Sequence, residues 1–100
     1  MANVHRTLGD ENIWVEFKPN GYAYKLQRLI REERDDVRLL EIITPFVVAC
    51  HLPKVDGDFT EIVIDVSNLD EVEDNVVIGL IREFFAFRQE RLFSPVPPNS

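Results

Sequence analysis

Cys50 and His51 form the one adjacent pair whose side chains could serve as a nucleophile and its base. Such a pair works only when the imidazole can accept the thiol proton directly. The apolar spacing around the pair predicts a helix, in which neighbouring side chains point about 100° apart and do not face each other. Because cysteine is among the most buried residue types, we expect Cys50 in the core and His51 near a helix C-terminus. We predict no catalytic residue and no enzyme.

Oxygen-bearing side chains alternate at residues 56–61, in the order Asp-Gly-Asp-Phe-Thr-Glu, as in a calcium-binding loop. An EF-hand loop needs glycine at its sixth position and glutamate at its twelfth, where this chain has Glu61 and Ser67. One cysteine and two histidines do not make a zinc set. A phosphate-binding glycine loop and a serine nucleophile elbow are also missing from the sequence. We therefore predict no metal and no cofactor.

The acidic residues are concentrated in one segment. Residues 53–75 carry eight carboxylates against Lys54 alone, which accounts for the whole formal net charge of −7. One interpretation is a solvated loop followed by a helix start, where Asp and Glu are favoured. The other is a docking surface for a basic partner. The acidic balance argues against electrostatic binding to nucleic acid or to an anionic membrane.

Length and composition predict one small α+β domain. The chain has 100 residues, of which 45% are apolar, and it lacks the run of about 18 apolar residues that a membrane span needs. The polar start after Met1 lacks a secretory h-region, and a single cysteine fits a reducing, cytoplasmic setting. We expect the domain over residues 1–94, with residues 1–11 as a loose arm and residues 95–100 as a proline-rich flexible tail.

Strand signals dominate the first third. Residues 13–17 are rich in β-branched and aromatic side chains and predict a strand. Pro19-Asn20-Gly21 predicts a hairpin turn. Residues 22–26 then alternate as a return strand would, although a helical stripe starting at Tyr22 is an open alternative. We favour the hairpin through about residue 30.

A helical pattern of apolar residues spaced by three and four begins at Asp35 or Asp36 and continues to His51. Pro45 lies inside it, so we predict either a kink or a new helix with Thr44 as its N-cap. Leu52-Pro53 ends this central helix. Residues 55–58 predict a tight turn and residues 59–66 an extended segment. Ser67 and Asp70 have the spacing of a capping box at the start of a long helix over residues 69–92.

The last helix carries two apolar sides. On a helical wheel its core side falls within about 340° to 80°, and a second side spans about 120° to 180°. The core side comprises Val76, Val77, Leu80, Phe84 and Phe87, and the second comprises Ile78, Ile81, Phe85 and Leu92. Either both sides are clamped within the fold or the second side contacts another protein. We favour the second interpretation and predict a protein-binding site of Ile78, Ile81, Phe85, Arg82, Asp70 and Asp74.

The order of these elements resembles the small tail-assembly chaperones of tailed bacteriophages with long non-contractile tails. The features that carry the resemblance are the strand at residues 13–17, the aliphatic run 47–52, Val55-Asp56-Gly57, the stretch 69–72, the helical stretch 76–84 and the proline-containing end. The resemblance implies a non-enzymatic protein that binds the tape-measure protein in the host cytoplasm. Self-association through the second apolar side of the last helix is a further expectation. The alternative is an acidic inhibitor that mimics nucleic acid. The concentration of negative charge in residues 53–75 is the observation that suggests it.

Overall fold

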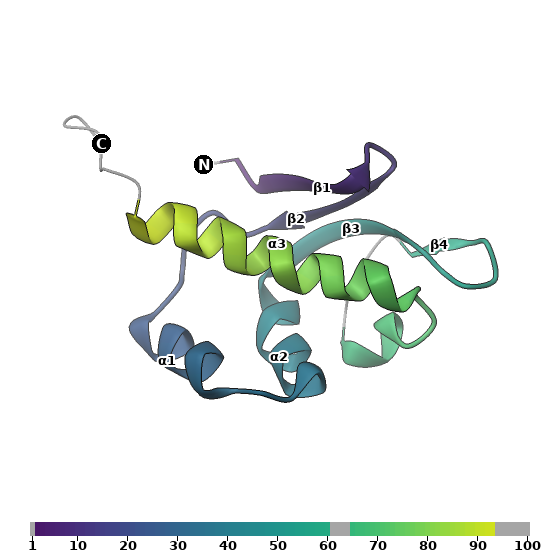
Figure 1. Cartoon of the computed structure of the whole chain (residues 1–100). Coiled ribbons are helices and arrows are strands. Elements are labelled where there is room, and N and C mark those ends of the chain that lie inside the picture. The colour runs from purple at the N-terminus through teal and green to yellow at the C-terminus, as the bar shows by residue number, and fades with distance from the viewer. Residues whose placement is uncertain (1, 61–64, 94–100) are drawn as a thin grey trace.

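The computed structural model describes residues 2–60 and 65–93, with the side chains of residues 91–93 left out. Strands and helices alternate irregularly along the chain, which defines an α+β fold (Figure 1). The elements are β1 (Val4–Asp10), β2 (Ile13–Phe17), α1 (Tyr24–Glu32), α2 (Asp36–Ile43), the 3-10 helix η1 (Thr44–Phe46), β3 (Val47–Pro53), β4 (Phe59–Thr60), the 3-10 helix η2 (Val66–Leu69) and α3 (Asp74–Phe93).

The strands form one antiparallel sheet in the order β1-β2-β3-β4. The strand expected at residues 13–17 is confirmed, and the fold begins with a β-hairpin as predicted. Its partner, however, is β1, so the expectation of a loose arm over residues 1–11 is wrong. Val4 and Leu8 pack against the core. Core-facing and exposed side chains therefore alternate along this polar segment, as they do in a strand with one buried face.

The expected return strand after Gly21 is also wrong, because residues 24–32 form α1. Gly21 has a φ of +93°, as the turn signal required, but the turn leads into a helix. Leu26 and Ile30 are both buried. Arg28, which lies between them, is exposed. A strand would turn residues 26, 28 and 30 to one face, whereas a helix turns residues 26 and 30 to the core and residue 28 away from it, so the helical alternative describes this segment.

The central helix is shorter than expected and changes into a strand. It ends at Ile43, and η1, with Pro45 in its first turn, leads into β3. Pro45 cannot continue the backbone hydrogen bonding of α2. The next residues pair with β2 instead, with Cys50 opposite Val15 and Val47 opposite Phe17. The prediction of a helix through His51 is therefore wrong, because spacings of three can also arise from a strand that contains a bulge.

The long C-terminal helix is confirmed but begins at Asp74, five residues later than expected. Ser67 lies inside η2, where Asp65 accepts a hydrogen bond from the backbone N–H of Asn68 at 3.3 Å. The predicted capping box at residues 67–70 is therefore not the start of α3. Of the extended segment expected over residues 59–66, Phe59 and Thr60 form β4, and residues 61–64 lie outside the described part.

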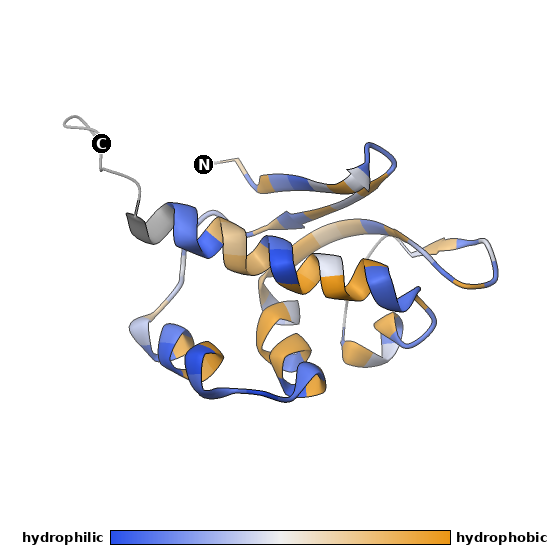
Figure 2. Cartoon of the chain, viewed as in Figure 1, coloured by the Kyte–Doolittle hydropathy of each residue, from blue (hydrophilic) through white to orange (hydrophobic). Residues whose placement is uncertain are grey.

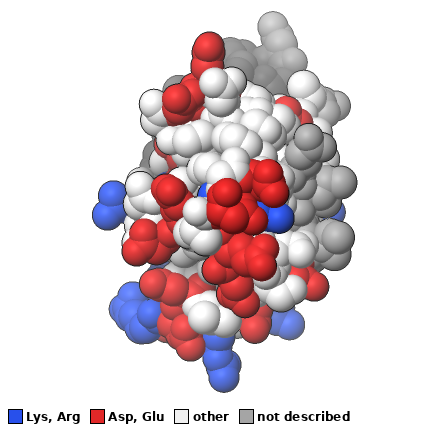
Figure 3. Space-filling model, turned by 90° about the vertical axis from the view of Figure 1, so that its right-hand side faces the viewer, with Lys and Arg blue, Asp and Glu red and all other residues white. Residues whose placement is uncertain are grey.

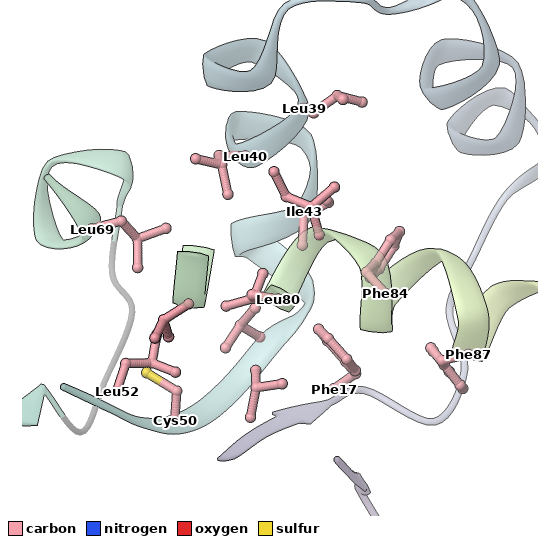
Figure 4. Packing of buried hydrophobic residues seen from close by; sticks show 14 of the residues in the cluster. Phe17, Leu39, Leu40, Ile43, Cys50, Leu52, Leu69, Leu80, Phe84 and Phe87 are labelled. Carbon is pink, nitrogen blue, oxygen red and sulfur yellow. The ribbon is translucent and has the colours of Figure 1, made fainter. Parts of the chain in front are cut away.

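The core lies between the sheet and the helices (Figure 4). Phe17 of β2 stacks on Phe87 at 5.7 Å between ring centroids and meets Phe84 edge to face at 5.4 Å. Apolar residues line α2 and the first half of α3, whereas α1 is mostly hydrophilic (Figure 2). The predicted core side of α3 is confirmed. Val76, Leu80, Phe84 and Phe87 are buried and Val77 is half-buried.

Candidate functional site

A shallow apolar groove opens where α2, η2 and the first turns of α3 meet. Its volume is about 300 Å³. Aliphatic side chains line it and three carboxylates, from α2, the turn after η2 and α3, stand among them. We call it the acidic groove; its residues are Asp36, Val37, Leu40, Val66, Leu69, Asp70, Val72, Asp74, Val77, Ile78 and Ile81.

Two aliphatic side chains of the acidic groove are well exposed. Val37 is 52% exposed and Ile78 is 43% exposed, whereas Ile81 is only 8% exposed. Exposed aliphatic groups next to one another and rimmed by charges are typical of binding surfaces. The groove therefore has a buried floor and an accessible edge.

The backbone of the acidic segment is anchored to the end of β3. The Val55 N–H donates to the Glu71 carbonyl at 2.9 Å, and Lys54 pairs with Val72 in an isolated bridge. The Asp56 carboxylate accepts from the backbone N–H of Asp58 at 2.9 Å in the predicted tight turn. These bonds fix the main chain while leaving carboxylates at the surface, and Figure 3 shows Asp and Glu gathered over this end of the molecule.

Two of these acidic side chains contact the side chain of another described residue. Lys54 Nζ lies 3.8 Å from a Glu71 carboxylate oxygen. The Ser67 hydroxyl donates to Asp65, and this bond, helped by the backbone N–H groups of Asn68 and Ser67, lowers the pKa of the Asp65 carboxyl. Since a lowered pKa favours the charged form, Asp65 keeps its negative charge on the acidic end.

The structure brings four of the six predicted site residues together. Asp70, Asp74, Ile78 and Ile81 line the acidic groove. Phe85 is half-buried and lies against α1 instead, beside Ile30 and Arg31. Arg82 lies on the other flank of α3, in a depression with Leu8 and Ile13 of the hairpin.

The second apolar side of α3 is therefore mostly covered by the chain itself. Of Ile78, Ile81 and Phe85, only Ile78 is strongly exposed. Of the four members of this second side, the Leu92 side chain lies outside the described part. We expected the second side to contact another protein, with residues 22–30 counted as strand. The segment forms α1 instead and, with α2, covers most of that side.

Sequence reasoning missed Val37 and Asp36, which line the groove from α2. Val37 belongs to the helical pattern of apolar residues that begins at Asp35 or Asp36, and such a pattern predicts burial in the core. It lies close to the helix start, where Asp35 caps α2 by accepting from the Val37 N–H at 2.9 Å. A helix start often lies at the edge of a domain, and that position was the available signal.

Cys50 and His51 point to opposite faces of the sheet and cannot act together. Cys50 is fully buried, and this burial raises the pKa of its thiol to about 12. The expectation of a core cysteine is confirmed. His51 is not near a helix end; its ring stacks on Phe59 at 4.1 Å, and its Nδ1 lies 2.6 Å from the Asn12 carbonyl oxygen.

The outer face of the sheet carries a row of stacked rings. Trp14 lies between His5, at 5.1 Å, and His51, at 6.2 Å, measured between ring centroids. The His5 Nδ1 is 3.1 Å from a Glu16 carboxylate oxygen. Trp14 is thus a strand aromatic packed by its neighbours. Within residues 2–60 and 65–93 the His, Cys, Asp and Glu side chains form no group of three or more that could hold a metal ion.

Comparison with protein-family models, curated proteins and solved structures finds no match to this chain. None of the helices in the described ranges combines the length and the apolar character that a membrane crossing requires.

Proposed function

We propose that this chain is a non-enzymatic protein-binding protein whose acidic groove takes a segment of a partner that is both aliphatic and basic. The observation that carries the proposal is the pairing of Val37 and Ile78, both well exposed, with the carboxylates of Asp36, Asp70 and Asp74 in one groove. A helix with aliphatic side chains on one face and Lys or Arg beside them fits such a surface. The carboxylates speed encounter and select basic partners.

The resemblance to tail-assembly chaperones gives this proposal its particular form. The partner would then be a tape-measure protein, bound in the host cytoplasm before the tail tube polymerises, and the chaperone would self-associate. Supporting this form are two features of the resemblance, the strand at residues 13–17 and the long C-terminal helix, together with a groove that combines exposed aliphatic side chains with carboxylates. Light scattering of the purified chain over a range of concentrations measures the self-association directly.

The test is co-expression with the largest protein encoded immediately downstream of this chain. We expect the large protein to become more soluble and to copurify. Val37→Asp and Ile78→Asp should each lower the copurified amount about tenfold, the size of a typical hot-spot loss. Both side chains are exposed, so these variants should fold.

The matched control is Val55→Asp, which makes the same chemical change at a side chain that is 72% exposed and lies outside the acidic groove. It should copurify the client as the wild type does. If the groove variants fold and also bind like the wild type, the acidic groove is not the binding site.

The alternative function is an acidic inhibitor that mimics nucleic acid. The observation that favours it is the gathering of carboxylates over one end of the molecule, including Asp56 and Asp58 outside the groove. A mimic should lower the DNA binding of its target and lose this effect in the variant Asp56→Asn/Asp58→Asn. Client binding through the acidic groove should survive the same two substitutions, so one variant separates the two functions.

A further inference from the structure

The other end of α3 faces a cleft of opposite charge. Two adjoining hollows, of about 270 and 560 Å³, open between α1 and the C-terminal half of α3. They share four lining residues, Gln27, Arg31, Arg88 and Gln89. One hollow adds Ile30, Arg34 and Phe85, and the other adds Tyr22, Ala23 and Tyr24. We call the two together the arginine cleft.

Three arginines from three separate segments converge on this cleft. Arg31 lies in the last turn of α1, Arg34 in the loop before α2, and Arg88 on α3. The described lining contains no carboxylate. In a chain with a formal net charge of −7, such a concentration of positive charge is unexpected on composition alone.

Three carboxylates that lie near these arginines in sequence, Glu33, Asp35 and Glu90, have partners outside the cleft. Glu33 accepts hydrogen bonds at 3.1 Å from the backbone N–H groups of Arg34 and Asp35. Asp35 caps α2, and Glu90 pairs with Arg6 of β1. Across residues 2–60 and 65–93, Arg31 and Arg34 form no ion pair. Within those residues, no carboxylate competes with a ligand for these two guanidinium groups.

One wall of the cleft is held rigidly. The guanidinium carbon of Arg88 lies 4.3 Å from the centroid of the Tyr22 ring. That ring stacks on Phe46 at 4.7 Å, and its hydroxyl donates to the Lys18 carbonyl at 2.9 Å. A guanidinium stacked on a fixed ring loses little freedom when it binds an anion.

We propose that the arginine cleft binds the phosphate group of a small molecule. Guanidinium groups match phosphate oxygens with paired, charge-assisted hydrogen bonds. The amides of Gln27 and Gln89 add donors, and the hollows have the size of small-molecule sites. Tyr24, which is 70% exposed at the edge of the cleft, offers a ring on which a nucleobase can stack. This site is separate from the acidic groove and goes beyond the protein-binding function.

The experiment is titration calorimetry of the full chain at fixed low salt with inorganic pyrophosphate and, separately, with AMP. Both anions should bind the wild type. Arg31→Gln and Arg34→Gln should each weaken binding about tenfold, since each removes a charge-assisted pair of hydrogen bonds. Both side chains are exposed, and a thermal melt of each variant verifies that it folds.

The matched control is Arg28→Gln, which removes the same charge from α1 at an exposed residue that lines neither hollow. It should change the affinity less than about twofold, the size of a screened long-range effect. Tighter binding of AMP than of pyrophosphate, lost in Tyr24→Ala, would identify a nucleoside phosphate as the ligand, and AMP binding no tighter than pyrophosphate would identify the phosphate group alone as what the cleft recognises. The proposal is overturned if neither anion binds at millimolar concentration, or if Arg28→Gln weakens binding as much as the two cleft variants do.

Discussion

The two ends of α3 differ in charge and in how that charge is built. At its first turn, the acidic groove combines carboxylates with exposed aliphatic side chains. Near its last turns, the arginine cleft combines guanidinium groups with aromatic rings. Asp74 and Arg88 are separated by about 21 Å along the helix at ~1.5 Å per residue. The net charge of the whole chain does not reveal that the two ends of α3 carry opposite charges.

Part of this polarity stabilises the helix whether or not anything binds. Carboxylates near a helix N-terminus and cations near its C-terminus both complement the helix dipole. This explains Asp74 and contributes to the choice of Arg88. It does not explain Val37 and Ile78 in the groove, or Arg34 in a loop of the cleft. The comparison teaches that the second kind of residue, which the dipole leaves unexplained, is the better guide to binding.

The largest expected effect separates the floor of the acidic groove from its edge. Ile81→Asp would bury a carboxylate among apolar residues and should cost more than about 4 kcal/mol, enough to unfold a small domain. Ile78→Asp, at the exposed edge, should cost less than about 1 kcal/mol. Chemical denaturation of the two variants measures both values. Equal losses would mean that the groove has no accessible edge.

Cys50 provides a check that variants at either end leave the core intact. Burial raises the pKa of its thiol to about 12, so at pH 8 the folded chain should react with iodoacetamide about a thousandfold more slowly than the unfolded chain. Each groove or cleft variant should keep this protection. Fast alkylation of a variant in native buffer would trace its binding defect to loss of fold.

The same thiol makes stability depend on pH. Because its pKa is raised on folding, its contribution is complete below about pH 9 and is lost as the pH rises toward 12. Over that range Cys50→Ala should lose stability less steeply than the wild type does, by up to ~1.4 kcal/mol per pH unit. Denaturation curves at several alkaline pH values measure the two slopes, and parallel slopes would contradict the buried thiol.

A crossed set of variants tests whether the two ends bind independently. Asp70→Asn/Asp74→Asn should weaken binding of the basic client about tenfold and leave pyrophosphate binding almost unchanged. Arg31→Gln should do the reverse. Copurification and calorimetry on the same variants supply both readouts. If each variant weakens binding of both ligands equally, the substitutions act through the overall charge of the protein, and the two ends are not separate binding sites.

The smallest effect concerns an arginine that already has a partner. Arg6 binds Glu90, which raises the pKa of the guanidinium and lowers that of the carboxyl. Arg6→Gln should lower the melting temperature slightly at low salt and not at all at high salt, since exposed pairs are screened. The contribution of Glu90 should also disappear as acid protonates it. Arg34→Gln, which breaks no ion pair among the described residues, should leave the melting temperature unchanged at either salt concentration.

Several features could be predicted from short stretches of sequence, because the residues within each stretch determine them. The strand at residues 13–17, the tight turn around Gly57, the buried Cys50 and the core side of α3 were all predicted correctly. Each depends on side-chain pattern or on a backbone angle that only glycine adopts readily. The grouping of Asp74, Ile78 and Ile81 on one side of α3 likewise follows from helical spacing, whereas Asp70 reaches the groove from the turn after η2.

Other segments had apolar spacings that fitted both a helix and a strand. Only contacts with the rest of the fold decided between the two. Residues 22–30 fitted both a strand and a helix, and Val47–His51 fitted both a helix and a bulged strand. Burial of Leu26 and Ile30 with Arg28 exposed between them favoured the helix, and pairing with β2 favoured the strand. The placement of Phe85 and Arg82 on different surfaces depended on those outcomes, so no local pattern could supply it.

The amino-acid sequence by itself determined the α+β class, the acidic segment and the two-sided apolar character of the last helix, because composition and periodicity are properties of the chain. Tertiary structure alone decided which of those apolar residues remain exposed, and it alone brought Arg31, Arg34 and Arg88 to one cleft. The reason is physical. Burial and convergence depend on contacts between segments distant in the chain, and these contacts exist only once the sheet and helices have packed.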